Sequence, residues 1–209
     1  MVLGSGEREQ IVGVGAGQMS RVQSVHIACD KAGDRADRCA VQQPSFRELL
    51  VERVHLRGHF CTARHAAAYW RGESKAGNPV DARIINTSSG AGLQGSVGQS
   101  TYSAAKAGIA ALTLVQAAEM GRYGVTANAI APAARTRMTE AIFAETMQKP
   151  EDGSFDEMAP ENVAPLVVWL GSAESKDVTG RVFEVEAGRI SVADGWRKGP
   201  EGDKGARWE

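Results

Sequence analysis

The sequence has little of what marks several large classes of protein. Its 24 Lys and Arg residues almost balance its 25 Asp and Glu residues, so charge gives no reason to expect nucleic acid or an anionic membrane as a partner. No uninterrupted apolar run approaches the ~20 residues of a membrane-spanning helix, which excludes such a helix. The first ten residues, MVLGSGEREQ, lack the pattern of a signal peptide, so we expect a cytoplasmic location.

Cysteine is also scarce. Cys29, Cys39 and Cys61 are an odd number without the spacing of a metal site, so we interpret them as reduced thiols and expect no metal. The sequence has no internal repeat and no low-complexity block. What is present is a chain of 209 residues with 43% hydrophobic residues and 24 glycines, the composition of a soluble globular protein with one sizeable core.

Strand and helix patterns alternate after Pro44. Apolar residues at helical spacing predict a helix over residues 46–71, and Gly, Asn and Pro predict a loop over 72–81. Further on, the patterns predict strands over 82–87, 125–130 and 182–185, helices over 102–121 and 160–171, and a polar loop with one short helix over 137–158. Strands separated by helices of this length pair in parallel, so the predicted fold class is α/β.

Three polar residues form a candidate site. Tyr102 and Lys106 are four residues apart on a predicted helix, which puts both side chains on one face. Ser89 follows the strand over 82–87, where open parallel sheets place their sites. A lysine ammonium within ~4–6 Å of a phenol favours the phenolate, which suits general acid–base catalysis, and a serine hydroxyl can hold the substrate oxygen. Since a Tyr–Lys pair at this spacing is common, the pair alone would far more often belong to an ordinary helix surface than to a catalytic site.

The surrounding residues are more specific. The segment IINTSSGAGLQGSVGQSTYSAAKAGIAALT, followed by GVTANAIAPAARTRMT, closely resembles the C-terminal two thirds of the short-chain dehydrogenase/reductase family. The resemblance implies that the serine, tyrosine and lysine are catalytic, and that the tyrosine and lysine also contact the cofactor, the lysine through the nicotinamide ribose. It further implies that Ile130, Pro132 and Thr136 contact the nicotinamide. Asn128 is expected to brace the backbone locally.

A second family marker is VHLRGHF, over residues 54–60. Most of the superfamily has an asparagine where this chain has His55, and a histidine followed by RGHF resembles the hydroxyacyl-CoA dehydrogenases of the multifunctional β-oxidation enzymes. His55 is therefore a fourth candidate catalytic residue, because an imidazole can serve a proton relay. A purely structural role for His55 has equal weight. His26 and His65 lie in no motif, and we assign no role to them or to His59, the histidine within RGHF.

The cofactor half of such a fold is not recognisable before residue 46. Family members open with a βαβ unit whose glycine-rich turn holds the cofactor pyrophosphate, and this stretch contains neither TGxxxGIG nor NNAG. The nearest glycine cluster, over 13–17, leaves too few residues for the missing strands and helices. We therefore expect a partial Rossmann-like, doubly wound parallel sheet that lacks its N-terminal strands and leaves one flank of the strand over 82–87 unpaired. NAD(P) is the expected cofactor, with NAD favoured, and the absent turn weakens the case for its binding.

Residues 9–41 resemble a different family. The segment EQIVGVGAGQMSRVQSVHIACDKAGDRADRCAV is similar to part of the formyltransferase domain of the bifunctional purine-biosynthesis enzyme, without the Lys–His pair of that family. The expected organisation is an atypical segment over 1–45, a truncated dehydrogenase domain over 46–195 and a disordered tail over 196–209.

Three functional hypotheses follow. The first is an NAD(P)-dependent dehydrogenase acting on an alcohol or ketone, or on a 3-hydroxyacyl-CoA. The second is a truncated or chimeric chain without activity that associates through its helices, because the helix before Ser89 and the helix carrying Tyr102 form the usual dimer contact of this family. A homo-oligomer is therefore expected. The third, a formyltransferase remnant, has the least support.

Overall fold

The computed structural model describes residues 2–5, 10–11, 51, 53–136, 139 and 147–196. The strands are β1 (Val2–Ser5), β2 (Gln10–Ile11), β3 (Ala82–Thr87), β4 (Val125–Ala133), β5 (Val182–Glu186) and β6 (Arg189–Val192). The α-helices are α3 (Gly58–Lys75), α4 (Gly90–Gln94), α5 (Ser100–Met120) and α6 (Ala164–Gly171). A π-helical turn η2 (Arg53–Arg57) precedes α3, and the 3-10 turns are η3 (Gly121–Tyr123), η4 (Pro160–Val163) and η5 (Ala173–Ser175).

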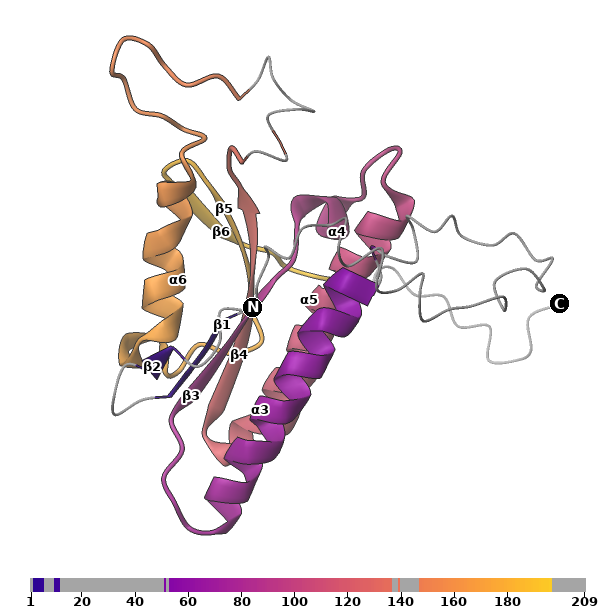
Figure 1. Ribbon diagram of the computed structural model, residues 1–209, viewed down its shortest axis with the longest axis vertical. Coiled ribbons are helices and arrows are strands. Elements are labelled where there is room, and N and C mark those ends of the chain that lie inside the picture. The colour runs from indigo at the N-terminus through magenta and orange to yellow at the C-terminus, as the bar shows by residue number, and fades with distance from the viewer. Residues whose placement is uncertain are drawn as a thin grey trace, which may run out of the picture.

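The six strands form one sheet in the order β2-β1-β3-β4-β5-β6. Strands β3, β4 and β5 are parallel, whereas β1 and β6 join them from either side as antiparallel neighbours. Figure 1 shows α3 and α5 over one face of the sheet and α6 over the other. This arrangement confirms the predicted α/β class, with a sheet that is parallel at its centre.

The core lies on both faces of the sheet because successive strand residues point to opposite sides. Ile84 of β3 packs with Trp70 and Met120 on the α3–α5 face, and its neighbour Ile85 packs with Leu170 on the α6 face. Ile84, Ile85 and Leu170 are each no more than 2% exposed. Burying a side chain of this size contributes about 1.5–3 kcal/mol, so the two clusters hold both helix layers on the sheet.

The unpaired flank predicted for β3 does not occur, because β1 occupies it. Val2 lies opposite Ile85 and Ser5 opposite Ala82 in an antiparallel pair. An exposed strand edge offers unpaired N–H and C=O groups to any extended segment within reach, and an antiparallel neighbour requires no crossover helix. The glycine cluster over 13–17, the segment over 12–50, the short helix expected near 140–146 and the tail over 197–209 lie outside the described residues.

The predicted element boundaries need two further corrections. Helix α3 continues past residue 71 to Lys75, because Gly72 is accommodated within it and the chain leaves only at Ala76 and at Gly77, whose φ is +85°. The short elements α4 and β6 were not predicted, since neither is long enough to show a periodic pattern. The helix expected over 160–171 is confirmed, with η4 as its first turn.

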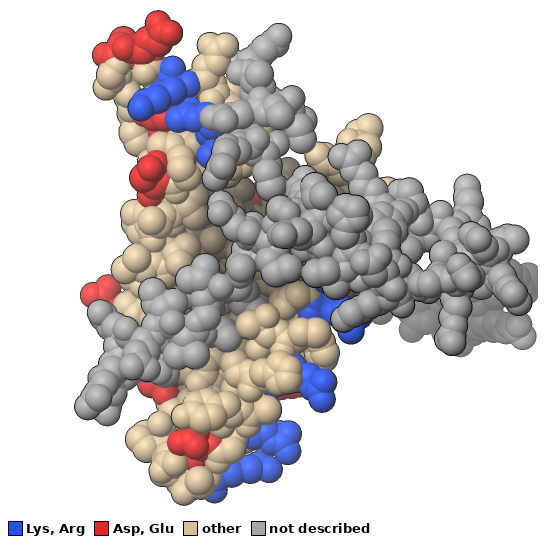
Figure 2. Space-filling view, viewed as in Figure 1, with Lys and Arg blue, Asp and Glu red and all other residues tan. Residues whose placement is uncertain are grey.

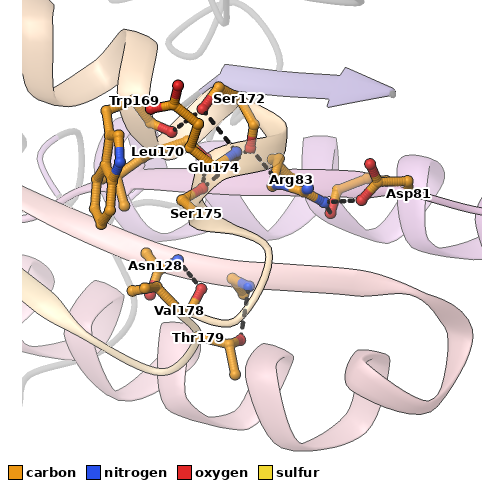
Figure 3. Close-up of polar contacts among 12 residues, drawn as sticks. Asp81, Arg83, Asn128, Trp169, Leu170, Ser172, Glu174, Ser175, Val178 and Thr179 are labelled. Carbon is orange, nitrogen blue, oxygen red and sulfur yellow. Dashed lines mark hydrogen bonds and ion pairs between the residues drawn. The ribbon is translucent and has the colours of Figure 1, made fainter. Parts of the chain in front are cut away.

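Buried polar side chains fix the loops that join α6 to β5 (Figure 3). Arg83 donates its Nε to the Ser172 carbonyl at 3.1 Å. Asn128 of β4 donates Nδ2 to the Val178 carbonyl at 2.7 Å, and its Oδ1 accepts from the Arg181 backbone N at 3.1 Å. These contacts confirm the local bracing role expected for Asn128 and hold β5 beside β4.

Candidate active site

The predicted site residues gather at the carboxyl ends of β3 and β4. Thr87, the last residue of β3, lies opposite Ile130 of β4, and the Ser88 backbone N donates to the Ile130 carbonyl at 2.7 Å. Open parallel sheets bind ligands at this edge, because the loops that leave adjacent strands diverge there. The backbone therefore brings the segment 87–89 next to the segment that follows β4.

Ser89 occupies the N-cap position of α4. Its backbone is extended, with φ −165° and ψ 151°, and its Oγ accepts from the Ala91 backbone N at 3.3 Å. This contact uses the serine as an acceptor, so the hydroxyl hydrogen can still be donated to a substrate oxygen. The short helix that follows packs on α5, where a Cβ at Gly92 would lie 2.6 Å from the Lys106 carbonyl carbon. Ser89 thus enters the site from a segment that is closely seated on α5.

Lys106 is buried, with 5% of its surface exposed, and is held at both of its ends. Its Nζ donates to the Thr87 carbonyl at 2.8 Å, and its own backbone carbonyl accepts from Ser88 Oγ at 2.8 Å. Burial lowers the pKa of Lys106 to about 8, because an ammonium loses hydration in the interior. At neutral pH the side chain is still mostly protonated, so the site holds a buried positive charge.

Tyr102 lies one helical turn before this charge. The Lys106 Nζ is 5.6 Å from the centre of the Tyr102 ring, within the range of a cation–π contact. On another side the His55 ring meets the Tyr102 ring edge-on, with 5.3 Å between the two ring centres. The structure thus brings His55, Tyr102 and Lys106 together, and Ser89 lies at the N-terminus of α4, which packs on α5.

His59 also belongs to this cluster, although its sequence context predicted no role. Its Nδ1 is 2.6 Å from the His55 carbonyl oxygen, and its Nε2 accepts from the Thr87 backbone N at 3.3 Å. The one signal in the sequence was its position four residues after His55, which places both histidines on the same face of the helical segment. His65, further along α3, is exposed.

The three residues expected beside the nicotinamide follow one another along the same edge. Ile130 is buried in β4, Pro132 lies near the end of that strand, and Thr136 comes after it, where its backbone N donates to Thr139 Oγ1 at 2.7 Å. The next loop is anchored by an ion pair between Arg135 and Asp156. The Arg135 guanidinium lowers the pKa of the Asp156 carboxyl, so the pair stays charged at neutral pH.

Comparison with known proteins identifies the family. The family model described as enoyl-(acyl carrier protein) reductase matches residues 9–189. A crystal structure of a short chain dehydrogenase from Mycobacterium avium is 60% identical to this chain, with a TM-score of 0.70, and the match covers 91% of this chain and 66% of that one. The chain belongs to the short-chain dehydrogenase/reductase family.

The chain is similar to proteins named as hydroxyacyl-CoA dehydrogenases and peroxisomal multifunctional enzymes. Hydroxyacyl-CoA dehydrogenase ChsB1 of Mycobacterium tuberculosis is 45% identical over 168 residues, which is 79% of this chain and 53% of the relative. Peroxisomal multifunctional enzyme type 2 of Mus musculus is 40% identical over 166 residues, which is 79% of this chain and 21% of that protein. The chain therefore spans about half the length of the mycobacterial relative. The family match also includes residues 9–41, the segment that resembled a purine formyltransferase.

The family's NAD(P) fits one end of this site. The ammonium of Lys106 has three N–H groups and gives one to Thr87, which leaves donors for ribose hydroxyls. Among the described residues, however, no βα unit with a glycine-rich turn lies beside β3. The strand next to β3 on that side is β1, which runs antiparallel to it. The described residues thus leave N–H donors at Lys106 for a ribose and contain no such unit beside β3 for a pyrophosphate.

The described part of the chain lacks two other features. None of its helices is long and apolar enough to cross a membrane. It also contains no group of three or more His, Cys, Asp or Glu side chains arranged to hold a metal ion.

The close packing of α4 on α5 leads to a first prediction. In Gly92→Ala the added methyl would meet the backbone of Lys106 and Ala107 at 2.6 Å, so α4 must move away from α5 and carry Ser89 with it. We expect a loss of about 1–3 kcal/mol in the free energy of unfolding, measured by denaturant titration. Gly90→Ala on the same helix is the matched control, because its nearest neighbour is a side-chain atom at 3.9 Å. Equal stability of the two variants would contradict the tight seating of α4.

Proposed function

We propose that this chain is an NAD(P)-dependent oxidoreductase that interconverts a secondary alcohol and a ketone. The observation that carries the proposal is the buried ammonium of Lys106, fixed to the end of β3 and one helical turn from the Tyr102 ring. A positive charge held there favours the phenolate form of a neighbouring phenol and so assists proton exchange with a substrate oxygen.

Each side chain has a distinct task in this reaction. When bound, NAD(P)⁺ supplies the hydride acceptor for alcohol oxidation, and its reduced form supplies the donor for the reverse direction. Tyr102 takes the hydroxyl proton of the alcohol as the carbonyl forms, and Ser89 donates a hydrogen bond to the same substrate oxygen. Lys106 stabilises the phenolate and offers its remaining N–H groups to the ribose. Ile130, Pro132 and Thr136 border the position of the nicotinamide.

The substrate class we propose is a 3-hydroxyacyl-CoA thioester. The names of the relatives from Mycobacterium tuberculosis and other organisms support this class, as does a histidine rather than an asparagine at His55. The His55 ring touches Tyr102 and could pass the proton onward. NAD is preferred to NADP in this proposal, which a side-by-side titration of the two reduced cofactors tests.

Binding and turnover test the proposal together. The purified chain is expected to change the fluorescence of NADH on binding and to form NADH from NAD⁺ and a 3-hydroxyacyl-CoA. A secondary alcohol without the CoA group serves as the control for substrate class. If circular dichroism shows a folded chain that neither binds NADH nor transfers hydride, the enzyme proposal fails.

The second candidate function is that of a chain without enzymatic activity that associates with another copy. A surface groove supports the association. A groove of about 520 Å³ lies between α3 and α5, with exposed apolar side chains at Phe60 and Val115. Arg64 and Arg71 border it on α3 and Glu119 on α5, and Figure 2 shows basic side chains along the α3 side. We propose that a second copy covers this groove, which light scattering tests. A dimer that lacks NADH binding would favour this candidate over the first.

We also propose that residues 1–45 are an atypical segment joined near 42–45 to the dehydrogenase domain, although the family model matches residues 9–189 across this junction. Sequencing the gene across these codons tests this. A continuous reading frame that encodes a glycine-rich turn upstream would contradict it.

A further inference from the structure

His59 occupies a position that no function assigned above requires. It is the second residue of α3, and its ring extends from the helix to the last residue of β3. On one side Nδ1 is 2.6 Å from the His55 carbonyl oxygen, and on the other Nε2 is 3.3 Å from the Thr87 backbone N. A carbonyl oxygen only accepts and a backbone N–H only donates. Both contacts can therefore exist only if the ring is neutral and carries its proton on Nδ1.

The two backbone polar groups of Thr87 contact side chains from different helices. Its N–H is donated to the His59 ring, and its carbonyl accepts from the Lys106 ammonium at 2.8 Å. The orientation of Thr87 therefore sets where the Lys106 Nζ can lie. Thr87 is still paired with Ile130 of β4, and the contacts from His59 and Lys106 add to that pairing at the last residue of β3.

The chain of contacts connects the two sides of the candidate site. It runs from the His55 carbonyl through the His59 ring to Thr87, and from there to Lys106. His55 and Lys106 at its ends both contact the Tyr102 ring. The turn that contains His55 is π-helical, a conformation that is rare and frequently found at functional sites.

Burial keeps this ring in the form that the contacts need. Desolvation lowers the pKa of His59 to about 4, although its hydrogen bond to the His55 backbone acts in the opposite direction, and the nearby charge of Lys106 lowers it further. At neutral pH the imidazole is therefore uncharged, and its Nε2 retains the lone pair that accepts from Thr87. A charged ring could not accept there.

We propose that His59 is a positioning residue for Lys106, which it orients through the backbone of Thr87. This rests on the proposed function only in the role of Lys106 toward Tyr102 and the ribose. A merely structural role, in which His59 pins α3 to the sheet, would leave the environment of Lys106 unchanged when the ring is replaced.

The first test reads the ring itself. Nitrogen NMR of the full chain with labelled histidine is expected to show His59 at pH 7 with a protonated Nδ1 and an unprotonated Nε2. His65, which is exposed on the same helix, provides the reference for an imidazole in solvent. A His59 ring protonated on Nε2 would overturn the proposal without any variant, since such a ring cannot accept from Thr87.

The second test replaces the ring. His59→Phe keeps a planar apolar shape and removes both hydrogen bonds, whereas His59→Gln offers an amide that can both donate and accept. In His59→Phe we expect the titration midpoint of Lys106, followed by NMR of labelled lysine, to fall below that of the wild type, because its acceptor is no longer held in place. His59→Gln is expected to restore the midpoint at least in part, and His65→Phe to leave it unchanged.

Activity gives a third readout that separates the two proposals. If the wild type transfers hydride, His59→Phe is expected to lower kcat roughly 10-fold, with a much smaller change in the KM for the acyl-CoA, and His59→Gln to recover part of the loss. If the wild type is inactive, the proposed function fails while the lysine titration still tests His59. An unchanged Lys106 midpoint in folded His59→Phe would overturn the positioning role. If that variant does not fold, the ring tautomer and His59→Gln decide in its place.

Discussion

Tyr102→Phe is expected to lower kcat by about 10²–10⁴-fold while leaving the affinity for NADH nearly unchanged. The substitution removes one oxygen, the atom that exchanges a proton with the substrate. It keeps the ring that meets His55 edge-on and lies near the Lys106 ammonium. Steady-state kinetics with a 3-hydroxyacyl-CoA gives kcat, and titration of NADH fluorescence gives the affinity.

Tyr69→Phe is the matched control for this experiment. Tyr69 lies on α3 with 64% of its surface exposed, so removal of its hydroxyl should alter neither quantity. Unaltered turnover in Tyr102→Phe would show that another group exchanges the proton. A loss of NADH affinity equal to the loss of kcat would indicate that the phenol binds the cofactor rather than acting as an acid or base.

The parallel centre of the fold was predictable because its elements carry their own patterns. The short apolar run of β3, the alanine-rich α5 and the strand β4 each have a periodicity or composition that can be recognised in isolation. Since the serine comes directly after β3, and the tyrosine and lysine share one face of α5, the candidate triad could also be predicted.

The parts of the fold and site that could not be predicted depend on contacts between distant parts of the chain. Strand β1 is four residues long and shows no strand pattern, and it takes its place from the open edge of β3 about eighty residues later. His59 is similar, since the residue that defines its role, Thr87, lies 28 residues further on. No local pattern marks a histidine whose partner is a backbone N–H at the end of a strand. Only the packing of α3 against β3 brings the two together.

The buried ammonium of Lys106 leads to the second large effect, a dependence of stability on pH. The pKa of Lys106 is about 8 in the folded chain and 10.5 for an ordinary lysine. Between these pH values the unfolded chain binds a proton that the folded chain does not, so raising the pH favours folding. The free-energy cost of burying the Lys106 ammonium is fully present below about pH 8 and is relieved as the pH rises to 10.5. Over this pH range the free energy of unfolding is expected to rise by at most about 3 kcal/mol.

Lys106→Met isolates this contribution. Methionine has a similar length and no charge, so the difference in unfolding free energy between wild type and variant should change with pH across this range. Denaturant titrations at several pH values measure it. Lys75→Met provides the control, because Lys75 lies exposed at the end of α3. A constant difference between wild type and Lys106→Met would contradict the desolvation of the ammonium.

The same variant connects this charge to the proposed chemistry. A hydrogen bond from a charged donor is worth about 1.5–3 kcal/mol, so its loss should weaken NADH binding roughly 10- to 100-fold if Lys106 holds the ribose. Turnover should fall by more than binding does, because the charge that favours the Tyr102 phenolate is lost as well. A variant that binds NADH normally but turns over slowly would assign Lys106 to the phenol alone. Normal NADH binding together with normal turnover in Lys106→Met would show that the buried charge has no role in catalysis.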